Sequence, residues 1–432
     1  MRFRQRGLVA YISVAHAFIH TIEITYAVLL SRIGDDFGSD LFVLGIIANG
    51  FAFMFGFAAL PSGVLVDRLG IQRVLFLAFT AAAVSALLVA TAPNTWTLGL
   101  FLALLGMSIG LYHPAGLSFI AKVMERRPGD TAGRGLALGW HGVAGNLGIA
   151  ATPALAIGVA EVFDWRWAYV VLALLALLAA ISLRLVRLES PGASTPEPAP
   201  EPGSESAPPV EEPRRPVAPA PVRSARFLPL LLVYGVFILN GFVYRGSLTF
   251  LPVHLEERLH ISWFGLDEAW LAGSLTTLAL LGGAFGQLFG GVLSERYRLE
   301  RLAVPLTLSM LPFLLLIGTT SGLPLVLFAA LFVFANFSGQ PIYTGLIADY
   351  SPQRALGRSY GVSFFAAFGI GSVAATLAGF FANRWGTDSV FLMLAGFVLV
   401  TVVLALAIWR LGERAVRRET GPREEAAGWG GE

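Results

Sequence analysis

Four polar side chains share one face of an otherwise apolar segment near the start of the sequence. They are spaced i, i+3, i+7 and i+10 and comprise Ser13, His16, His20 and Glu23. On an α-helix this spacing forms a single stripe. The apolar run that contains them, 8–30, would span about 35 Å as a helix, enough to cross a bilayer. Because ionisable groups at membrane depth are costly, their presence indicates a function.

Proton transfer is the chemistry that these residue types favour. A carboxyl group in a cavity of low dielectric constant can bind a proton from one side of a membrane and release it to the other. Imidazoles titrate near physiological pH and can relay or sense that proton. We expect Glu23 to be the proton site, with His16, His20 and His113 acting beside it.

Arg245 is the arginine in the middle of a later apolar run, 227–255. Its guanidinium stays protonated and binds carboxylate or phosphate through a planar fork, which favours an anionic or zwitterionic substrate. Alternatively, Arg245 is permanently paired with Glu23 and holds two helices together. The two roles are compatible, because protonation of Glu23 would free Arg245 for an anionic group.

Polar side chains also interrupt other apolar runs at helical spacing. In the run 323–348 they stand at i, i+4 and i+7. The predicted substrate contacts are Tyr112, Asn240, Tyr244, Arg245, Asn336, Gln340 and Tyr343. His141 and Asn146 are weaker candidates.

The spacing His16-x3-His20-x2-Glu23 is also typical of metal ligands on one helical face. A divalent-metal transporter is therefore an alternative. The other polar stripes offer amides and an arginine instead of carboxylates, so we expect no metal site. The chain has no cysteine, and its single lysine, Lys122, does not stand in a phosphate-binding Gly-Lys-Ser/Thr motif. We expect no cofactor and no enzymatic activity.

Composition places the chain in the membrane. Of its 432 residues 56% are apolar and 13% are charged, and the mean hydropathy is +0.70. Long apolar runs recur along the whole sequence, which indicates a polytopic all-α membrane protein. The twelve predicted helices are 7–33, 42–66, 74–92, 96–123, 134–160, 165–186, 227–255, 268–294, 302–320, 323–348, 359–383 and 388–410.

A proline-rich segment divides the chain. It holds 11 of the 24 prolines and almost no large apolar residues, so we expect an extended tether. The predicted organisation is an N-terminal six-helix half (1–188), a cytoplasmic linker (189–226), a C-terminal six-helix half (227–411) and a charged cytoplasmic tail (412–432).

The distribution of basic residues predicts the orientation. Of the 30 arginine and lysine residues, 25 fall on the side that the predicted helices give to both termini and the linker. Four fall on the opposite side (Arg32, Arg166, Arg258 and Arg384), and Arg245 lies inside a helix. Because basic residues concentrate in cytoplasmic loops, we expect both termini in the cytoplasm and the protein in the cytoplasmic membrane.

The two halves carry related sequences. GVLVDRLGIQR (63–73) is similar to GVLSERYRLER (291–301), and IAATPA (149–154) is similar to VAATLA (373–378). His113-Pro114 aligns in the same way with Gln340-Pro341. Pseudo-symmetric halves are typical of transporters whose site lies at the midplane between them.

The pattern Gly63-x3-Asp67-Arg68-x-Gly70 resembles the signature loop of the major facilitator superfamily. The resemblance covers the whole chain, although Ile71-Gln72 replaces the usual basic pair. It implies the twelve-helix major facilitator fold. It also implies a gate on the cytoplasmic side, formed by Gly63, Asp67, Arg68, Gly70, Glu295 and Arg296.

Within this superfamily the chain resembles the fosmidomycin-resistance-type efflux branch. The shared motifs are Ser13-x-x-His16, Tyr112-His113-Pro114 and Gly145-Asn146-Leu147-Gly148. His20 stands where the branch has an aspartate. Glycines at such spacing also let helices approach closely.

These features predict a secondary active transporter that moves a small organic solute by alternating access, with proton-coupled efflux as the favoured reaction. Proton-coupled uptake of an organic anion, a divalent-metal transporter and a non-transporting sensor are the alternatives. We expect a monomer whose partners are the lipid bilayer, a small organic solute, for which Arg245 favours an anion, and protons, with no nucleic acid.

Overall fold

The computed structural model describes residues 3–124, 134–186, 227–259, 268–351 and 356–420. Every regular element in these ranges is a helix, and twelve helices are long and apolar enough to cross a membrane. This confirms the predicted all-helical fold with twelve spans. The predicted linker, 189–226, lies outside the described residues.

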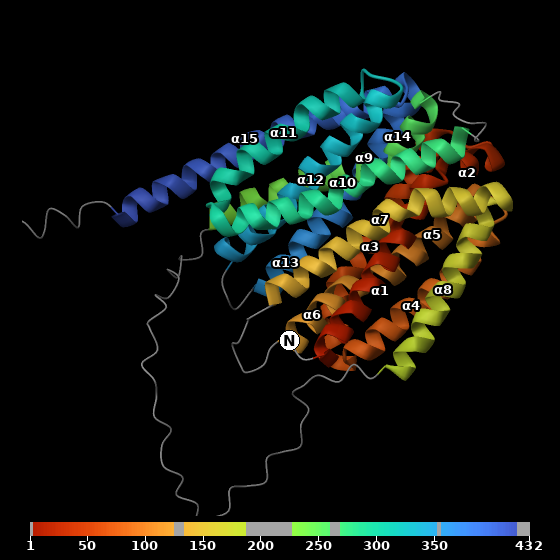
Figure 1. Ribbon diagram of the computed structural model, residues 1–432, viewed down its shortest axis with the longest axis horizontal. Helices are drawn as coiled ribbons and strands as arrows, with labels where there is room; N and C mark the ends of the chain where they lie inside the picture. The colour runs from red at the N-terminus through yellow and green to blue at the C-terminus, as the bar shows by residue number, and fades with distance from the viewer. Residues whose placement is uncertain (1–2, 125–133, 187–226, 260–267, 352–355, 421–432) are drawn as a thin grey trace, which may run out of the picture.

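The first half contains eight helical segments, drawn in red to yellow in Figure 1. They are α1 (Phe3–Val28), α2 (Leu30–Phe37), α3 (Leu41–Leu69), α4 (Ile71–Ala90), α5 (Thr95–Gly110), α6 (Tyr112–Met124), α7 (Arg134–Val162) and α8 (Trp165–Leu185).

The second half is drawn in green to blue. Its segments are α9 (Phe227–Leu259), α10 (Glu268–Arg296), α11 (Leu299–Ile317), α12 (Leu323–Tyr350), α13 (Leu356–Phe364), the π-helical turn η2 (Phe365–Gly369), the 3₁₀ turn η3 (Ile370–Ser372), α14 (Val373–Trp385) and α15 (Asp388–Thr420).

Three predicted helices are interrupted. The predicted helix 96–123 divides at Leu111, between α5 and α6. Pro114 lacks the backbone N–H that would bond to the carbonyl of Gly110, which accounts for the break at this point. The predicted helix 7–33 divides at Leu29, and 359–383 contains the turns η2 and η3. Such π-helical turns often occur at functional sites.

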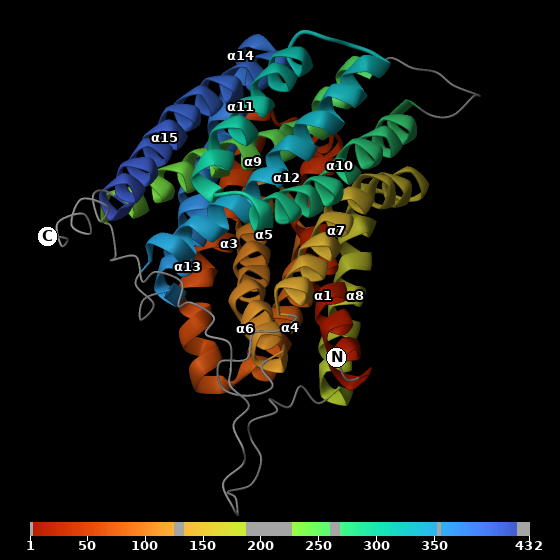
Figure 2. The ribbon, with the colours of Figure 1, turned by 60° about the vertical axis from the view of Figure 1, so that its left-hand side comes forward.

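The halves meet along two pairs of helices, α7 with α10 and α3 with α14, and the first pair is visible in Figure 2. Small residues allow the close approach. A Cβ on Gly45 of α3 would stand 2.5 Å from the carbonyl oxygen of Ala375, and one on Gly273 of α10 would stand 2.6 Å from Ile157. These contacts lie toward the ends of the helices that face away from the start of α1.

The contact between α7 and α10 is looser toward the other side. We call the side on which α1 begins and α15 ends the termini side, and the opposite one the far side. A Cβ on Gly142 of α7 would stand 3.2 Å from Gln287 of α10, and both residues lie nearer the termini-side end of their helix than its middle. Closer to the termini side, Gly139 and Gly291 have nothing within 4 Å of that position. At these two positions α7 and α10 are therefore not in contact, whereas they touch at Gly142 and at Gly273.

Candidate functional site

A buried ion pair joins the two halves. Arg245 Nη2 of α9 donates to Glu23 Oε1 of α1 at 2.6 Å, and both side chains are almost fully buried. The guanidinium carbon also lies 5.7 Å from the ring centre of Tyr244. Nε of Arg245 has no hydrogen-bond partner among the described residues. The pairing that the sequence left open is thus present, and Nε is a buried donor of the guanidinium that no described residue accepts from.

Two histidines extend this pair along α1. His20 Nδ1 lies 2.6 Å from Glu23 Oε2, and His20 Nε2 lies 3.1 Å from His16 Nε2. His16 Nδ1 lies 2.7 Å from the backbone carbonyl oxygen of His141 on α7. The helical spacing of the stripe makes this chain of contacts, because side chains three and four residues apart lie one above the other.

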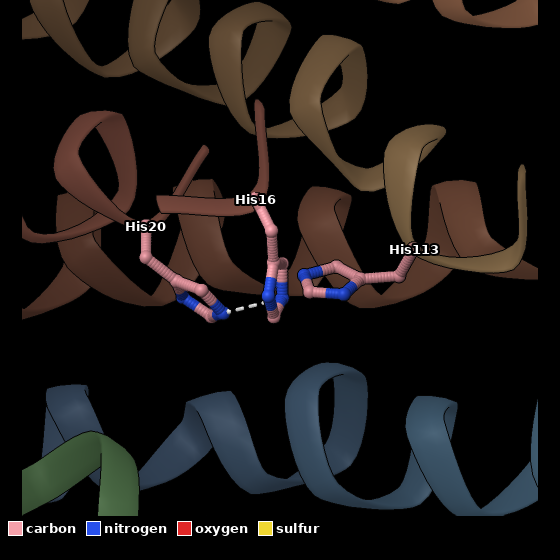
Figure 3. Close-up of side chains that lie close together, drawn as sticks. All are labelled: His16, His20 and His113. Carbon is pink, nitrogen blue, oxygen red and sulfur yellow. Dashed lines mark hydrogen bonds between the residues drawn. The ribbon is translucent and has the colours of Figure 1, made fainter. Parts of the chain in front are cut away.

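His113 and His141 complete a histidine cluster with His16 and His20. The ring of His141 stacks on that of His16 with 3.9 Å between centres, and the ring of His113 lies 5.2 Å from that of His16. One ring nitrogen each of His16, His20 and His113 lies within 4.8 Å of the other two. Figure 3 shows these three rings in a row, projecting from α1 and α6 toward a blue helix of the second half. The cluster is buried, and both ring nitrogens of His141 and Nε2 of His113 lack partners among the described residues.

Glycines on α7 make room for the cluster. A Cβ on Gly145 would stand 2.6 Å from Cε1 of His16 and 2.9 Å from Cδ2 of His20. A Cβ on Gly148 would overlap the carbonyl of Ala17. The Gly-Asn-x-Gly motif therefore brings α7 against α1 and leaves space for the two imidazoles.

Two of the predicted substrate contacts are engaged elsewhere. Tyr112 is fully buried, and its hydroxyl donates to the carbonyl oxygen of Ile12 at 2.5 Å, which ties α6 to α1. The hydroxyl of Tyr343 bonds to Thr307 and lies in a separate apolar cluster among α9, α11, α12 and α15. The structure does not bring these two hydroxyls to the ion pair.

The remaining predicted contacts lie on α9 and α12. Tyr244 is buried, with its ring 5.7 Å from that of Phe368. Asn240 is half-buried, and its Oδ1 has no partner among the described residues. Asn336 is half-buried and Gln340 is exposed.

Sequence reasoning missed Gln287. It lies on α10, where it faces α7, and Asn146 of α7 lies close to Gly283 one turn away. Oε1 of Gln287 and Oδ1 of Asn146 both lack partners among the described residues. The available signal was an amide inside the predicted apolar helix 268–294. Two unsatisfied amides from opposite halves are candidate solute contacts.

The predicted gate lies on the termini side. Gly70 joins α3 directly to α4 with φ +82°, a conformation that favours glycine. Arg68, Glu295 and Arg296 are exposed, and no ion pair among the described residues joins them across the halves. The side chain of Asp67 lies outside the described part of the chain. Gly63 is exposed, with open space where a Cβ would stand.

Polar contacts between the halves are also present on the far side. Ser31 Oγ of α2 donates to Glu256 Oε2 of α9 at 2.9 Å, and Arg32 lies 3.8 Å from the other oxygen of Glu256. Arg32 also pairs with Glu161 of α7. These contacts join the halves on the far side.

The sequence model of one family, the Major Facilitator Superfamily, matches residues 12–365, and a second match covers 264–431. The chain belongs to the major facilitator superfamily. The described residues contain twelve candidate spans, as expected for a multi-pass membrane protein of this family, which is one of transporters and not of enzymes.

Individual relatives match only parts of this superfamily member. The "Puromycin resistance protein pur8" of Streptomyces alboniger is 33% identical over 157 residues, 34% of this chain and 30% of that protein. The "Probable sulfoacetate transporter SauU" of Cupriavidus necator is 26% identical over 280 residues, 65% of this chain and 62% of that protein. The chain thus spans less than two thirds of the length of these relatives.

Solved structures share the fold over nearly the full length. A bacterial homolog of the human lysosomal transporter Spinster, in an inward-facing and unoccupied conformation, superimposes with a TM-score of 0.73 at 14% identity, covering 95% of this chain and 98% of that one. The xylose transporter XylE from E. coli, inward open, gives 0.70 at 12% identity, covering 94% and 95%. At these identities the likeness establishes the fold alone.

Proposed function

We propose that this secondary transporter exports a small organic solute in exchange for protons. The observation that carries the proposal is the ion pair between Glu23 and Arg245, which joins the two halves inside the membrane and continues into a histidine cluster. Protons and an anionic solute are the two ligands that such groups bind. Proposed contacts for the solute are Arg245, Tyr244 and Asn240, with Asn146 and Gln287 added from the structure.

The ion pair supplies a physical link between proton binding and alternating access. Removing one partner of a buried pair leaves an uncompensated charge, which costs about 3–5 kcal/mol. A change of proton or solute occupancy beside Glu23 therefore alters the stability of the contact between the halves. A ligand shifts a conformational equilibrium only through such a difference in interaction energy.

Similarity to resistance proteins supports the outward direction. The motifs around Ser13, His113 and Gly145 resemble the fosmidomycin-resistance-type branch, and a second similarity is to a puromycin resistance protein. We further propose that the two halves, 1–188 and 227–411, move against each other, that 189–226 is a tether, and that both termini are cytoplasmic. With that orientation the looser ends of α7 and α10 face the cytoplasm.

Uptake of an organic anion is the second candidate. Nε of Arg245 has no partner within the described part of the chain, and the longest similarity among the relatives described above is to the "Probable sulfoacetate transporter SauU". In this reading the solute and the proton enter together, and the solute carboxylate or sulfonate binds Arg245.

Drug tolerance tests the export proposal. Wild type and Glu23→Gln are expressed in a host stripped of its own efflux pumps and exposed to a panel that includes fosmidomycin and puromycin. Tolerance with wild type alone supports export coupled through Glu23. If no compound separates the strains although both proteins reach the membrane, export is contradicted, and uptake of sulfonates and carboxylates into vesicles tests the second candidate.

A further inference from the structure

Three contacts in a row connect the histidine cluster with the ion pair. His16 Nδ1 contacts the carbonyl oxygen of His141 at 2.7 Å. His16 Nε2 contacts His20 Nε2 at 3.1 Å. His20 Nδ1 contacts Glu23 Oε2 at 2.6 Å. Each distance is that of a hydrogen bond, and each hydrogen bond needs one proton between its two atoms.

The three side chains do not hold three protons in their ordinary states. A neutral imidazole carries one ring proton and a carboxylate carries none. Two neutral histidines and an ionised Glu23 therefore supply two protons for three contacts. The carbonyl oxygen of His141 only accepts, so Nδ1 of His16 must donate to it. The missing proton falls on one of the two contacts of His20, where two lone pairs would otherwise face each other.

We propose that the structure represents a proton-loaded state, in which one additional proton resides on His20. The His20 imidazolium then donates from Nε2 to His16 and from Nδ1 to Glu23, and all three contacts are satisfied. This inference deepens the proposed function, on which its role in transport rests. It moves the proton site from Glu23, where the sequence placed it, to the neighbouring imidazole.

The ion pair determines which residue holds the proton. Glu23 Oε1 accepts from Arg245 at 2.6 Å, and a charge-assisted contact of this kind stabilises the carboxylate. A proton on Glu23 would leave Arg245 buried beside a neutral acid. A proton on His20 keeps the carboxylate ionised between two donors.

The surrounding charges also favour a proton over a divalent cation. Several titratable side chains lie near His16 and His20. They are Glu23 from α1, Tyr112 and His113 from α6, His141 from α7, and Tyr244 and Arg245 from α9. In this set the one carboxylate balances the one guanidinium. A proton adds one net positive charge to a buried site, whereas a divalent ion adds two, at a greater desolvation cost.

Loss of this proton would open one of the two contacts of His20. A neutral His20 donates from a single nitrogen, so it keeps either His16 or Glu23 as its acceptor. Because Glu23 is held by Arg245 of the other half, the proton on His20 alters a contact at the interface between the halves. His113 lies beside His16 and His20, and its Nε2 has no partner in the ranges that the structure describes, so it is the next base that can accept the proton (Figure 3).

Nitrogen NMR of the histidine rings tests the assignment directly. The full chain is labelled with ¹⁵N-histidine and placed in lipid nanodiscs without solute at neutral pH. With six histidines in the chain, the ring signals can be assigned by single substitutions. We expect one histidine with both ring nitrogens protonated, and loss of that signal in His20→Gln. We also expect a proton on Nδ1 and none on Nε2 of His16.

His16→Phe gives a second, sharper test. It keeps an aromatic ring against His141 but removes the acceptor for His20 Nε2, so only one contact of His20 remains. We expect His20 to become neutral at neutral pH in this variant. His254→Gln is the control: His254 is buried and bonds to Thr387 and Ile317 far from the cluster, and its substitution leaves the doubly protonated signal unchanged.

Three outcomes would overturn the assignment. One is that every histidine is neutral at neutral pH. Another is an infrared band of a protonated carboxyl group that disappears in Glu23→Gln, which would place the proton on Glu23. A third is a stoichiometric shift of the His16 and His20 signals on addition of Zn²⁺ alone, which would make the pair a metal site. These readouts do not require transport. A protonated His20 together with proton-independent flux in vesicles would contradict the proposed function and leave this inference standing.

Discussion

Arg245 of α9 donates to Glu23 of α1 across the interface between the two halves, 222 positions apart in the sequence and 2.6 Å apart in space. The pair is buried, and Glu23 also accepts from His20 in the proton-loaded state. The two carboxylate oxygens of Glu23 therefore connect the interface between the halves with the histidine cluster.

The charge balance of this pair gives the first prediction. Glu23→Gln leaves Arg245 without a counter-charge and should lower the stability by about 3–5 kcal/mol. It should also abolish proton-driven transport while solute exchange remains. Thermal unfolding of the purified protein and vesicle flux measure the two effects. The double variant Glu23→Gln/Arg245→Gln should recover much of the stability but not the driven transport. Driven flux at the wild-type rate in Glu23→Gln would refute the role of this carboxylate.

Arg245 should contribute to the recognition of anionic solutes. A hydrogen bond to a charged group contributes about 1.5–3 kcal/mol, so its loss should weaken anion binding tenfold or more. The comparison is best made between Glu23→Gln and Glu23→Gln/Arg245→Gln, because neither leaves an unpaired carboxylate. Arg258→Gln, on the same helix but paired with Asp388, is the control. Equal weakening of neutral and anionic solutes would show that Arg245 has only a structural role.

Gly145 should tolerate no side chain. Gly145→Ala places a methyl group within 3 Å of both His16 and His20 and should displace the rings, at a cost of about 1–3 kcal/mol. Proton-driven flux should also fall in Gly145→Ala. Gly158→Ala, on the same helix, meets no atom within 4 Å and should behave as wild type. Equal flux in the two variants would mean that the imidazoles need not keep their present positions.

The contacts of Glu256 should stabilise the conformation in which the halves are joined on the far side. Glu256→Gln weakens a partly exposed ion pair, worth up to about 1 kcal/mol, and should shift the ratio of conformations up to about fivefold. The chain has no cysteine, so spin labels at Gly139→Cys and Gly291→Cys can report the separation on the termini side. Glu257→Gln is a matched control, because Glu257 bonds to Thr387 within its own half. The prediction fails if both variants leave the label distances unchanged.

Removal of 191–221 should leave transport largely intact. Its composition lacks the apolar residues that a packed element needs. Vesicle flux normalised to the amount of inserted protein measures the effect. Complete loss of flux despite normal insertion would show that the segment does more than tether the halves.

The sequence alone determined the twelve spans and the stripe on the first helix. Apolar runs of bilayer length admit few structures other than helices, since backbone polar groups in lipid must be satisfied within the segment. The spacing of His16, His20 and Glu23 fixed their common face, because helical periodicity is a local property. The break at Leu111 depends on Pro114, so it was also predictable from the sequence.

Only the tertiary structure decided which faces meet. Tyr343 belongs to a polar stripe as regular as that of α1, and Tyr112 directly precedes His113 in the sequence. The hydroxyls of both tyrosines nevertheless bond to neighbouring helices away from the ion pair. Gln287 is a single amide in an apolar run, so its position at the interface between the halves was not predicted. Periodicity shows which residues share a helical face. The direction in which that face points is set by packing against helices distant in sequence, and here by the glycines that let α7 approach α1.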